Sequence, residues 1–240
     1  MTDDRTVLDA VRRALHSESR VRPTEGPIHL AFAEGELTME GEVDHIAGKK
    51  LALEAAARLP GVDTIVDRLH VRPATLMGDG DIRDKVRDAL LEEITLAACT
   101  IRVWDKGYLE TMRDPADAVG TIDVRVGDGV VTLDGDVPGH GQKRLAGVLA
   151  WWVPGSRDVF NGIGVTPPEQ DSEAGVTDAV LQVLEKDPFV NSESIRIHTR
   201  RAVVTLDGTV PREAEVKLAE DDAWYVFGVD KVVNRLIVRM

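Results

Sequence analysis

Histidine and cysteine are the side chains most often used for metal binding and nucleophilic catalysis, and this sequence has six histidines and one cysteine. The histidines are His16, His29, His45, His70, His140 and His198. No two are three or four residues apart, the spacing that places metal ligands on one helix face. Cys99 lies in no motif that would bring a base to its thiol, and a lone cysteine excludes an intramolecular disulfide. The sequence therefore predicts no catalytic residue, no metal and no cofactor.

The glycine-rich segments and the overall charge argue against a phosphate-binding loop and against a nucleic-acid-binding protein. The segments MGDGDI (77–82) and GHG (139–141) do not follow the strand–loop–helix pattern of phosphate-binding loops. The 240 residues include 29 basic and 42 acidic side chains, and the resulting net charge of −13 opposes binding to nucleic acid. We therefore expect a non-enzymatic protein with no nucleic-acid partner.

Three similar segments indicate three copies of one structural unit. They are GELTMEGEV (35–43), GVVTLDGDV (129–137) and AVVTLDGTV (202–210), and each alternates apolar and polar residues. A glycine occupies the same position in every copy, and a second glycine follows 20 residues later. These six glycines are Gly41, Gly135 and Gly208, then Gly61, Gly155 and Gly228. The segments after the second glycine also align, with Asp67, Asn161 or Asn234 at the matching polar position.

Each copy contains helical and strand patterns in the same order. VLDAVRRAL (7–15), IRDKVRDAL (82–90) and VTDAVLQVL (176–184) have apolar residues at helical spacing. The alternating segments that begin at Ile28, Ile122 and Ile195 predict strands, and the stretch between the two glycines is again helical. We predict an α+β protein of three tandem αββαβ two-layer domains, at residues 1–75, 76–168 and 169–240.

This order, with V-x-L-x-G-x-V followed after a helix by G-V-x-x-V-x-N-x-L-x-V, resembles the BON domain (bacterial OsmY and nodulation). The third copy matches most fully, through Val204, Leu206, Gly208, Val210, Gly228, Val229, Val232, Asn234, Leu236 and Val238. The first copy departs at Met39 and Asp67, and the second at Ser156. The resemblance implies an association with osmotic stress or the bacterial envelope, binding to phospholipid or to a protein partner, and no enzymatic activity.

The shared glycines and asparagines are interpreted as structural. The first glycine of each copy lies in a strand where a neighbouring element comes close, and the second ends a helix in the left-handed conformation. Asn161 and Asn234 belong to the same structural pattern.

The second copy contains an insertion. Its interval from Leu90 to Gly135 is 45 residues, against 24 from Leu184 to Gly208 in the third copy. The extra residues lie at about 96–120, where TIRVW followed by DKG predicts an added hairpin. The hairpin would contain Trp104, and it serves either as a functional surface or as a cover for the edge of its own sheet.

Two aromatic pairs occupy equivalent places near the end of the second helix of copies two and three. They are the WW of AWWVPG (150–155) and the WY of AWYVFG (223–228), whereas copy one has Ala57 and Arg58 there. An arginine at this place indicates that the site lies outside each domain's own core, and exposed aromatics are typical of contact surfaces. We predict an interaction surface of Trp151, Trp152, Trp224 and Tyr225, with Trp104 and Tyr108. It packs copies two and three together or against the insertion; the alternatives are a protein partner, a homo-oligomer and peripheral phospholipid.

We expect from these features a non-catalytic binding or scaffold protein. The alternative is a ligand-sensing regulatory module that holds a small molecule or an ion in an inter-domain cleft. The first residues, MTDDRTVLDAVRR, lack the apolar segment of a secretory signal, and no apolar run approaches the roughly 20 residues of a membrane-spanning helix. The expected location is cytoplasmic, or periplasmic if a leader has been removed.

Overall fold

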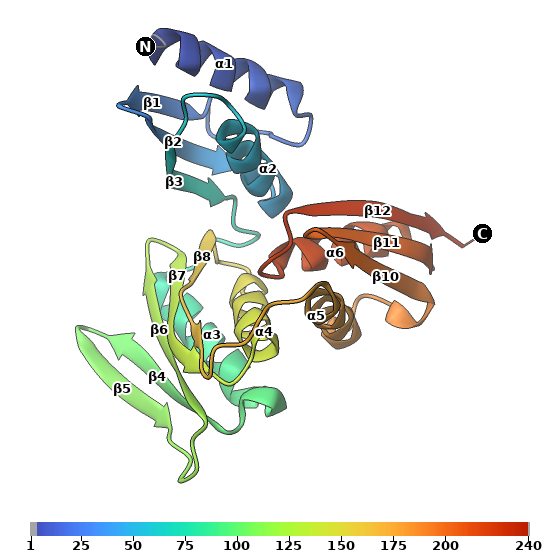
Figure 1. Cartoon of the computed structure of the whole chain (residues 1–240). Coiled ribbons are helices and arrows are strands. Elements are labelled where there is room, and N and C mark those ends of the chain that lie inside the picture. The colour runs from blue at the N-terminus through green and yellow to red at the C-terminus, as the bar shows by residue number, and fades with distance from the viewer. Residues whose placement is uncertain (1–3, 240) are drawn as a thin grey trace. The chain divides into compact units, whose positions relative to one another are not determined.

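The computed structural model describes residues 4–239, and the same set of helices and strands recurs three times along the chain (Figure 1). The first copy consists of α1 (Asp4–Ser17), β1 (His29–Ala33), β2 (Glu36–Val43), α2 (Ile46–Ala57) and β3 (Thr64–Val71). Its sheet has the order β1-β2-β3, with β1 antiparallel and β3 parallel to β2. The parallel pairing follows from α2, which carries the chain back to the starting end of the sheet.

The third copy repeats this topology. It consists of α5 (Glu173–Lys186), β10 (Ile195–Arg200), β11 (Val203–Val210), α6 (Glu213–Tyr225) and β12 (Lys231–Val238). The sheet order is β10-β11-β12, again with one antiparallel and one parallel pairing. A short 3-10 helix, η2 (Ser192–Ser194), precedes β10.

The second copy has the same plan with a wider sheet. Its repeated elements are α3 (Asp79–Glu92), β6 (Gly120–Gly127), β7 (Val130–Val137), α4 (His140–Trp151) and a last strand in two parts, β8 (Asp158–Asn161) and β9 (Gly164–Val165). The insertion contains the 3-10 helix η1 (Ile94–Leu96) and a hairpin of β4 (Cys99–Asp105) and β5 (Tyr108–Arg113). Because β4 pairs in parallel with β6, the sheet has the order β5-β4-β6-β7-β8, and β9 also pairs with β7. The predicted α+β fold of three αββαβ copies, with an insertion in the second, is confirmed.

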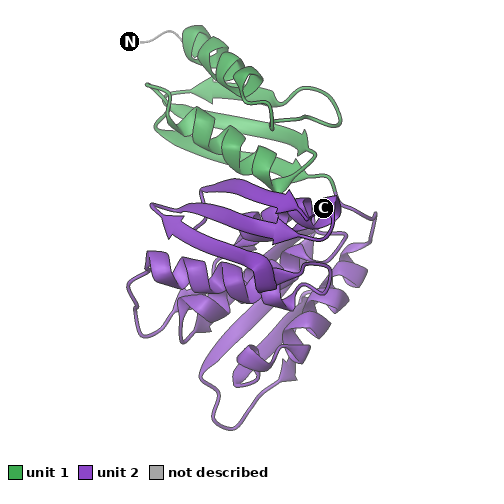
Figure 2. Cartoon of the chain, turned by 90° about the vertical axis from the view of Figure 1, so that its right-hand side faces the viewer, with its two compact units in different colours: residues 1–72 green, residues 73–240 purple. Residues whose placement is uncertain are grey.

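The chain divides into two compact units, residues 1–72 and residues 73–240, and the second unit contains copies two and three (Figure 2). Residues 166–172 connect β9 to α5 without regular secondary structure. We therefore keep 76–168 and 169–240 as the proposed limits of the two domains in this unit.

Each copy buries an apolar core between its sheet and its two helices. In copy two, the alternating strand residues Ile122 and Leu133 are fully buried together with Val86 and Leu90 of α3. The second helix of each copy packs through pairs of alanines, all of them fully buried: Ala52 and Ala56, Ala146 and Ala150, Ala219 and Ala223. These small side chains let the helix approach the sheet closely.

Glycine is required in the central strands of copies two and three because the neighbouring backbone leaves no room for a side chain. Gly208 has φ +141°, and a Cβ atom there would lie 2.0 Å from the carbonyl oxygen of Ser194. Gly135 is similar, with φ +107° and 2.2 Å to the carbonyl oxygen of Thr121. The predicted left-handed conformation after the second helix is wrong for Gly155, which is absent from the positive-φ residues of the described chain. There a Cβ would lie 2.6 Å from the Cβ of Met77, so packing and not helix termination requires the glycine.

The polar residue in the last strand of each copy ties that strand to the second helix. Asn161 Nδ2 donates to the carbonyl of Lys143 at 2.7 Å, and Asn234 Nδ2 donates to the carbonyl of Val216 at 2.8 Å. In copy one the direction is reversed, because the Nζ of Lys49 on α2 lies 3.0 Å from a carboxylate oxygen of Asp67.

Candidate functional site

The predicted aromatic surface lies where copies two and three meet, at the contact of α4 with α5 and α6. The indole of Trp151 stacks on the ring of Tyr225, with centroids 5.4 Å apart and an interplanar angle of 16°. The Nε1 of Trp152 donates to Oδ1 of Asp222 on α6 at 2.8 Å. Trp151, Trp152 and Tyr225 therefore hold the two copies together.

The other three predicted aromatic residues differ in their surroundings. Trp224 is fully buried, which fits packing and not an open docking surface. Trp104 lies on β4 of the inserted hairpin, where the guanidinium of Arg125 sits 4.5 Å from the centre of its ring. Tyr108, at the start of β5, is 76% exposed. Within residues 4–239, no ring contact joins these two hairpin residues to Trp151 or Tyr225.

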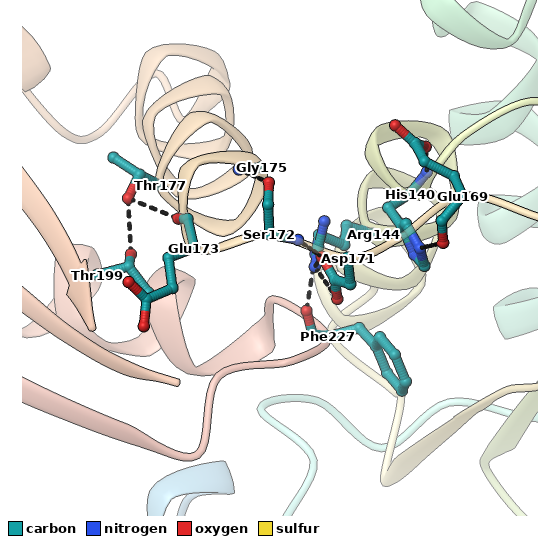
Figure 3. A network of polar contacts seen from close by, with 10 residues as sticks. All are labelled: His140, Arg144, Glu169, Asp171, Ser172, Glu173, Gly175, Thr177, Thr199 and Phe227. Carbon is teal, nitrogen blue, oxygen red and sulfur yellow. Dashed lines mark hydrogen bonds and ion pairs between the residues drawn. The ribbon is translucent and has the colours of Figure 1, made fainter. Parts of the chain in front are cut away.

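Arg144 on α4 connects copy two to the linker and to copy three (Figure 3). Its side chain is 1% exposed, so its charge must be paired within the protein. Its Nε donates to the carbonyl of Phe227 at 2.9 Å, and one terminal nitrogen lies 2.5 and 2.6 Å from the two carboxylate oxygens of Asp171. Burial alone would raise the pKa of Asp171, but the hydrogen bonds and charge of Arg144 outweigh it and lower the pKa.

Short polar contacts fix the linker on both sides of Asp171 (Figure 3). On the α4 side, Nε2 of His140 lies 3.1 Å from the carbonyl oxygen of Glu169. On the α5 side, the hydroxyl of Ser172 accepts from the backbone N–H of Gly175 at 3.0 Å and so caps the helix. The linker is therefore attached both to α4 and to α5, the helix into which it leads.

A second polar cluster lies at the Trp152 end of the contact. Asp222 is 3% exposed and Asp187, at the end of α5, is 8% exposed. Burial, and then the proximity of Asp187 and Asp221, raise the pKa of Asp222 to about 8, against the hydrogen bond from Trp152, which lowers it. The raised pKa favours the protonated form of Asp222, a state in which two buried carboxyl groups can lie together without charge repulsion.

An ion pair between copies two and three involves the residue that precedes Asp187. Lys186 precedes Asp187, and its Nζ lies 2.9 Å from Oε2 of Glu93, which follows α3 of copy two. Glu93 is 8% exposed; burial raises its pKa, but the bonds to Lys186 and Thr95 outweigh that effect and lower it.

The ionisable groups of this contact are paired with one another. The contact therefore forms a joint between copies two and three. A cavity of about 220 Å³ adjoins the linker and is lined by His140, Arg144, Glu169, Asp171, Asp178 and Gln182, among others. Within residues 4–239, no group of three or more His, Cys, Asp or Glu side chains is placed to hold a metal ion. Cys99 is buried in the core of copy two, and burial is the main cause that raises the pKa of its thiol.

Sequence reasoning missed Arg144, Asp171, Asp187 and Asp222. Aligned on the second glycine, Asp222 occupies the position of Ala55 in copy one and of Leu149 in copy two. An acidic residue at a place that is otherwise apolar was the available signal for a specific buried contact. For Arg144 the signal was weak, because the equivalent residues, Lys50 and Lys217, are also basic.

The helices were also compared with the length and apolarity that a bilayer requires. Among residues 4–239, none is both long enough and apolar enough to cross a membrane.

Comparisons with known proteins agree with the three-copy organisation. The family model of the BON domain matches residues 3–73, 112–167 and 172–240. Over 121 residues, or 48% of this chain, the sequence is 32% identical to the osmotically-inducible protein Y of Escherichia coli (strain K12). The matched region covers 60% of that protein, so the chain spans less than two thirds of this relative.

Solved structures were compared as well. The C-terminal domain of CdsD, a structural protein of the type III secretion system of Chlamydia trachomatis, aligns with 100% of this chain and 99% of its own, with 13% identity and a TM-score of 0.26. A second CdsD structure covers 97% of this chain and 92% of its own, with 13% identity and a TM-score of 0.25.

Proposed function

The chain belongs to the BON domain family, and from this premise we propose that it is a non-catalytic binding and scaffold protein whose second and third domains act as one body. The observation that carries the proposal is the buried guanidinium of Arg144, which holds the linker at Asp171 and the third domain at Phe227. Such a joint fixes the surfaces of two small domains relative to each other, and preorganisation of this kind lowers the entropic cost of binding.

The pairing of ionisable groups favours binding over catalysis. The buried carboxylate of Glu93 is matched by Lys186, and Asp222 receives the indole N–H of Trp152. A general acid or nucleophile has to face the substrate, whereas these groups face one another across a packed contact.

We further propose a role in osmotic stress, supported by the similarity to the osmotically-inducible protein Y. The binding partner in this role is a protein, with phospholipid as the second possibility. Both possibilities require exposed surface.

The experiment combines cells and vesicles. Cells are crosslinked before and after a shift to high osmolarity, and the purified chain is floated with vesicles of neutral phospholipid, with or without anionic phospholipid. We expect a specific crosslinked partner whose amount rises after the shift, and no flotation. Flotation that depends on anionic phospholipid would support the phospholipid possibility; the absence of both crosslink and flotation would contradict a binding function.

A pair of variants tests whether the joint matters for this function. Arg144→Ala removes the link between the two domains, whereas Arg58→Ala removes an arginine whose side chain is 71% exposed at the end of α2. We expect the crosslink to weaken only in Arg144→Ala. Equal crosslinking in both variants would show that partner binding does not depend on the fixed arrangement of the two domains.

A ligand-sensing function is the second candidate, and the cavity beside Arg144 is the observation that favours it. Its volume of about 220 Å³ is below the range of about 300–1,000 Å³ that is usual for drug-sized ligands, so it suits an ion or a very small molecule. A thermal-unfolding screen against inorganic anions and cations tests this function, because a bound ligand raises the unfolding temperature. No shift with any ion at high concentration would count against it.

A further inference from the structure

The second copy shows how an added strand binds to this fold. Strand β4 pairs in parallel with the outer side of β6, in a register that places Ile101 opposite Ile122 and Val103 opposite Val124. In the third copy the strand equivalent to β6 is β10, which forms the end of its sheet (Figure 1). Within the described chain, no strand pairs with the outer side of β10.

The apolar surface that β4 covers in copy two is incompletely covered in copy three. Val124 on β6 is fully buried, whereas Ile197, the equivalent residue on β10, is partly exposed. Leu181 on α5 is 37% exposed. It lies one helical turn after Thr177, whose hydroxyl contacts that of Thr199 on β10 at 2.8 Å, so Leu181 lies on the helix stripe that runs beside this strand.

At one matched position the two edges carry opposite charges. In copy two, Arg102 of the added strand forms two hydrogen bonds with Asp123 on β6, at 2.6 and 2.7 Å. The residue equivalent to Asp123 on β10 is Arg196, and Arg200 follows on the same exposed face. A strand that binds here in the manner of β4 would therefore need carboxylates where β4 has its arginine.

We propose that the outer edge of β10 binds an extended segment of a partner protein, in which apolar residues alternate with acidic ones, as an added parallel strand. The apolar side chains would cover Ile197 and Leu181, and the acidic ones would lie beside Arg196 and Arg200. Addition of a strand to a free sheet edge is a general mode of peptide recognition. The proposal deepens the proposed binding function, on which it rests, by naming the type of partner.

The first copy offers a matched comparison, because β1 is also the end of its sheet. The exposed residues of β1 are His29, Ala31 and Ala33, so this edge lacks the arginines that would select an acidic strand. Of these two equivalent edges, β10 and not β1 is therefore expected to select acidic segments.

Two capped peptides based on residues 99–105 test the proposal. Both have serine at position 99; the acidic peptide has Arg102→Glu and Trp104→Glu, and the basic peptide keeps Arg102 and has Trp104→Lys. Each is titrated into the full chain, with binding followed by fluorescence anisotropy and the site located by amide hydrogen exchange. We expect the acidic peptide to bind and to protect β10, and Arg196→Glu to weaken it by on the order of tenfold or more.

Control variants keep the result interpretable. Arg196→Glu should bind the basic peptide better than the unmodified chain does, a gain that a misfolded variant would not show. Arg68→Glu, on β3 at the opposite edge of the sheet of copy one and with a side chain 63% exposed, should leave acidic-peptide binding unchanged. The proposal would be overturned if the acidic peptide did not bind, or if it bound Arg196→Glu as tightly as the unmodified chain.

The cellular crosslink separates this proposal from the broader function. A crosslinked partner that persists in Arg196→Glu would overturn the assignment of β10 while leaving the binding function intact. A concentration-dependent dimer seen by sedimentation velocity and abolished by Arg196→Glu would assign the edge to a second copy of the chain and would overturn the acidic partner.

Discussion

The ring centroids of Trp151 and Tyr225 lie 5.4 Å apart and the ring planes are within 16° of parallel. The ends of α4 and α6 therefore contact each other through stacked rings. The two residues are not equivalent in the repeat, since Trp151 is four residues before Gly155 and Tyr225 is three residues before Gly228. The stack therefore joins non-equivalent positions of the two domains. Each domain contributes a different member of its aromatic pair.

We expect Trp151→Ala to destabilise the unit of residues 73–240. Loss of the stack removes about 0.5–1.5 kcal/mol beyond the apolar area that Trp151 buries. Urea unfolding of the full chain, followed by circular dichroism, measures the loss. Trp104→Ala is the control, because Trp104 lies on the inserted hairpin and should not affect the contact between domains; equal effects of the two substitutions would contradict the assignment.

Arg144→Met should destabilise the same unit more strongly. It removes the guanidinium that donates to the carboxylate of Asp171 and to the carbonyl of Phe227. Removal of one partner of a buried ion pair costs about 3–5 kcal/mol, less where the partner is partly exposed as Asp171 is. We therefore expect about 2–3 kcal/mol, measured by urea unfolding. Limited proteolysis should then cleave the linker at 166–172 faster. Unchanged cleavage would show that the linker is held by other contacts.

The stability of the contact should fall as the pH rises from about 4 to about 8. The folded state raises the pKa of Asp222 from an ordinary value near 4 to about 8, so it binds this proton more tightly than the unfolded state does. The resulting stabilisation is complete below about pH 4 and is lost as the pH passes through about 8. Asp222→Asn mimics the protonated acid and keeps an oxygen for Trp152.

The test of this pH effect is the difference in unfolding temperature between wild type and Asp222→Asn. The wild type should lose stability relative to the variant across this range. A constant difference would show that Asp222 is not the titrating group. The lowered pKa values of Asp171 and Glu93 act in a separate window, because their contribution is lost only as the pH falls below about 4.

Gly208→Ala should destabilise copy three by more than about 2 kcal/mol, because it combines a left-handed backbone with a Cβ placed 2.0 Å from a carbonyl oxygen. Gly127→Ala in β6 is the control, since a Cβ there has nothing within 4 Å. Thermal unfolding should show a large shift for the first variant and almost none for the second. A tolerated Gly208→Ala would mean that β10 and β11 can separate locally.

The fold could be predicted from the sequence because the same pattern of glycines and apolar residues occurs three times. A glycine such as Gly135 is uninformative alone, but three in register at the same place in an alternating segment indicate a close approach of strands. The same logic located the aromatic pairs and the inserted hairpin. What could not be predicted was the parallel pairing of β4 with β6, because alternation shows that a strand exists and not which neighbour it joins.

The polar joint was unpredictable for a different reason. Arg144 and Asp171 are 27 residues apart, and charged residues are so common in this chain that no pair stands out. Their relation depends on how two domains pack, which no local pattern reports.

The inserted hairpin moves the edge of its sheet outward and does not remove it. Strand β5, the new edge, is six residues long, and its pairing with β4 shifts register between Ile101 and Arg102. A short, irregular edge is a poor template for further strands, which protects the widened sheet against aggregation. On β10 the protection is different, because two copies of that edge would bring arginines together, so its positive charge would exclude self-pairing and still admit an acidic strand.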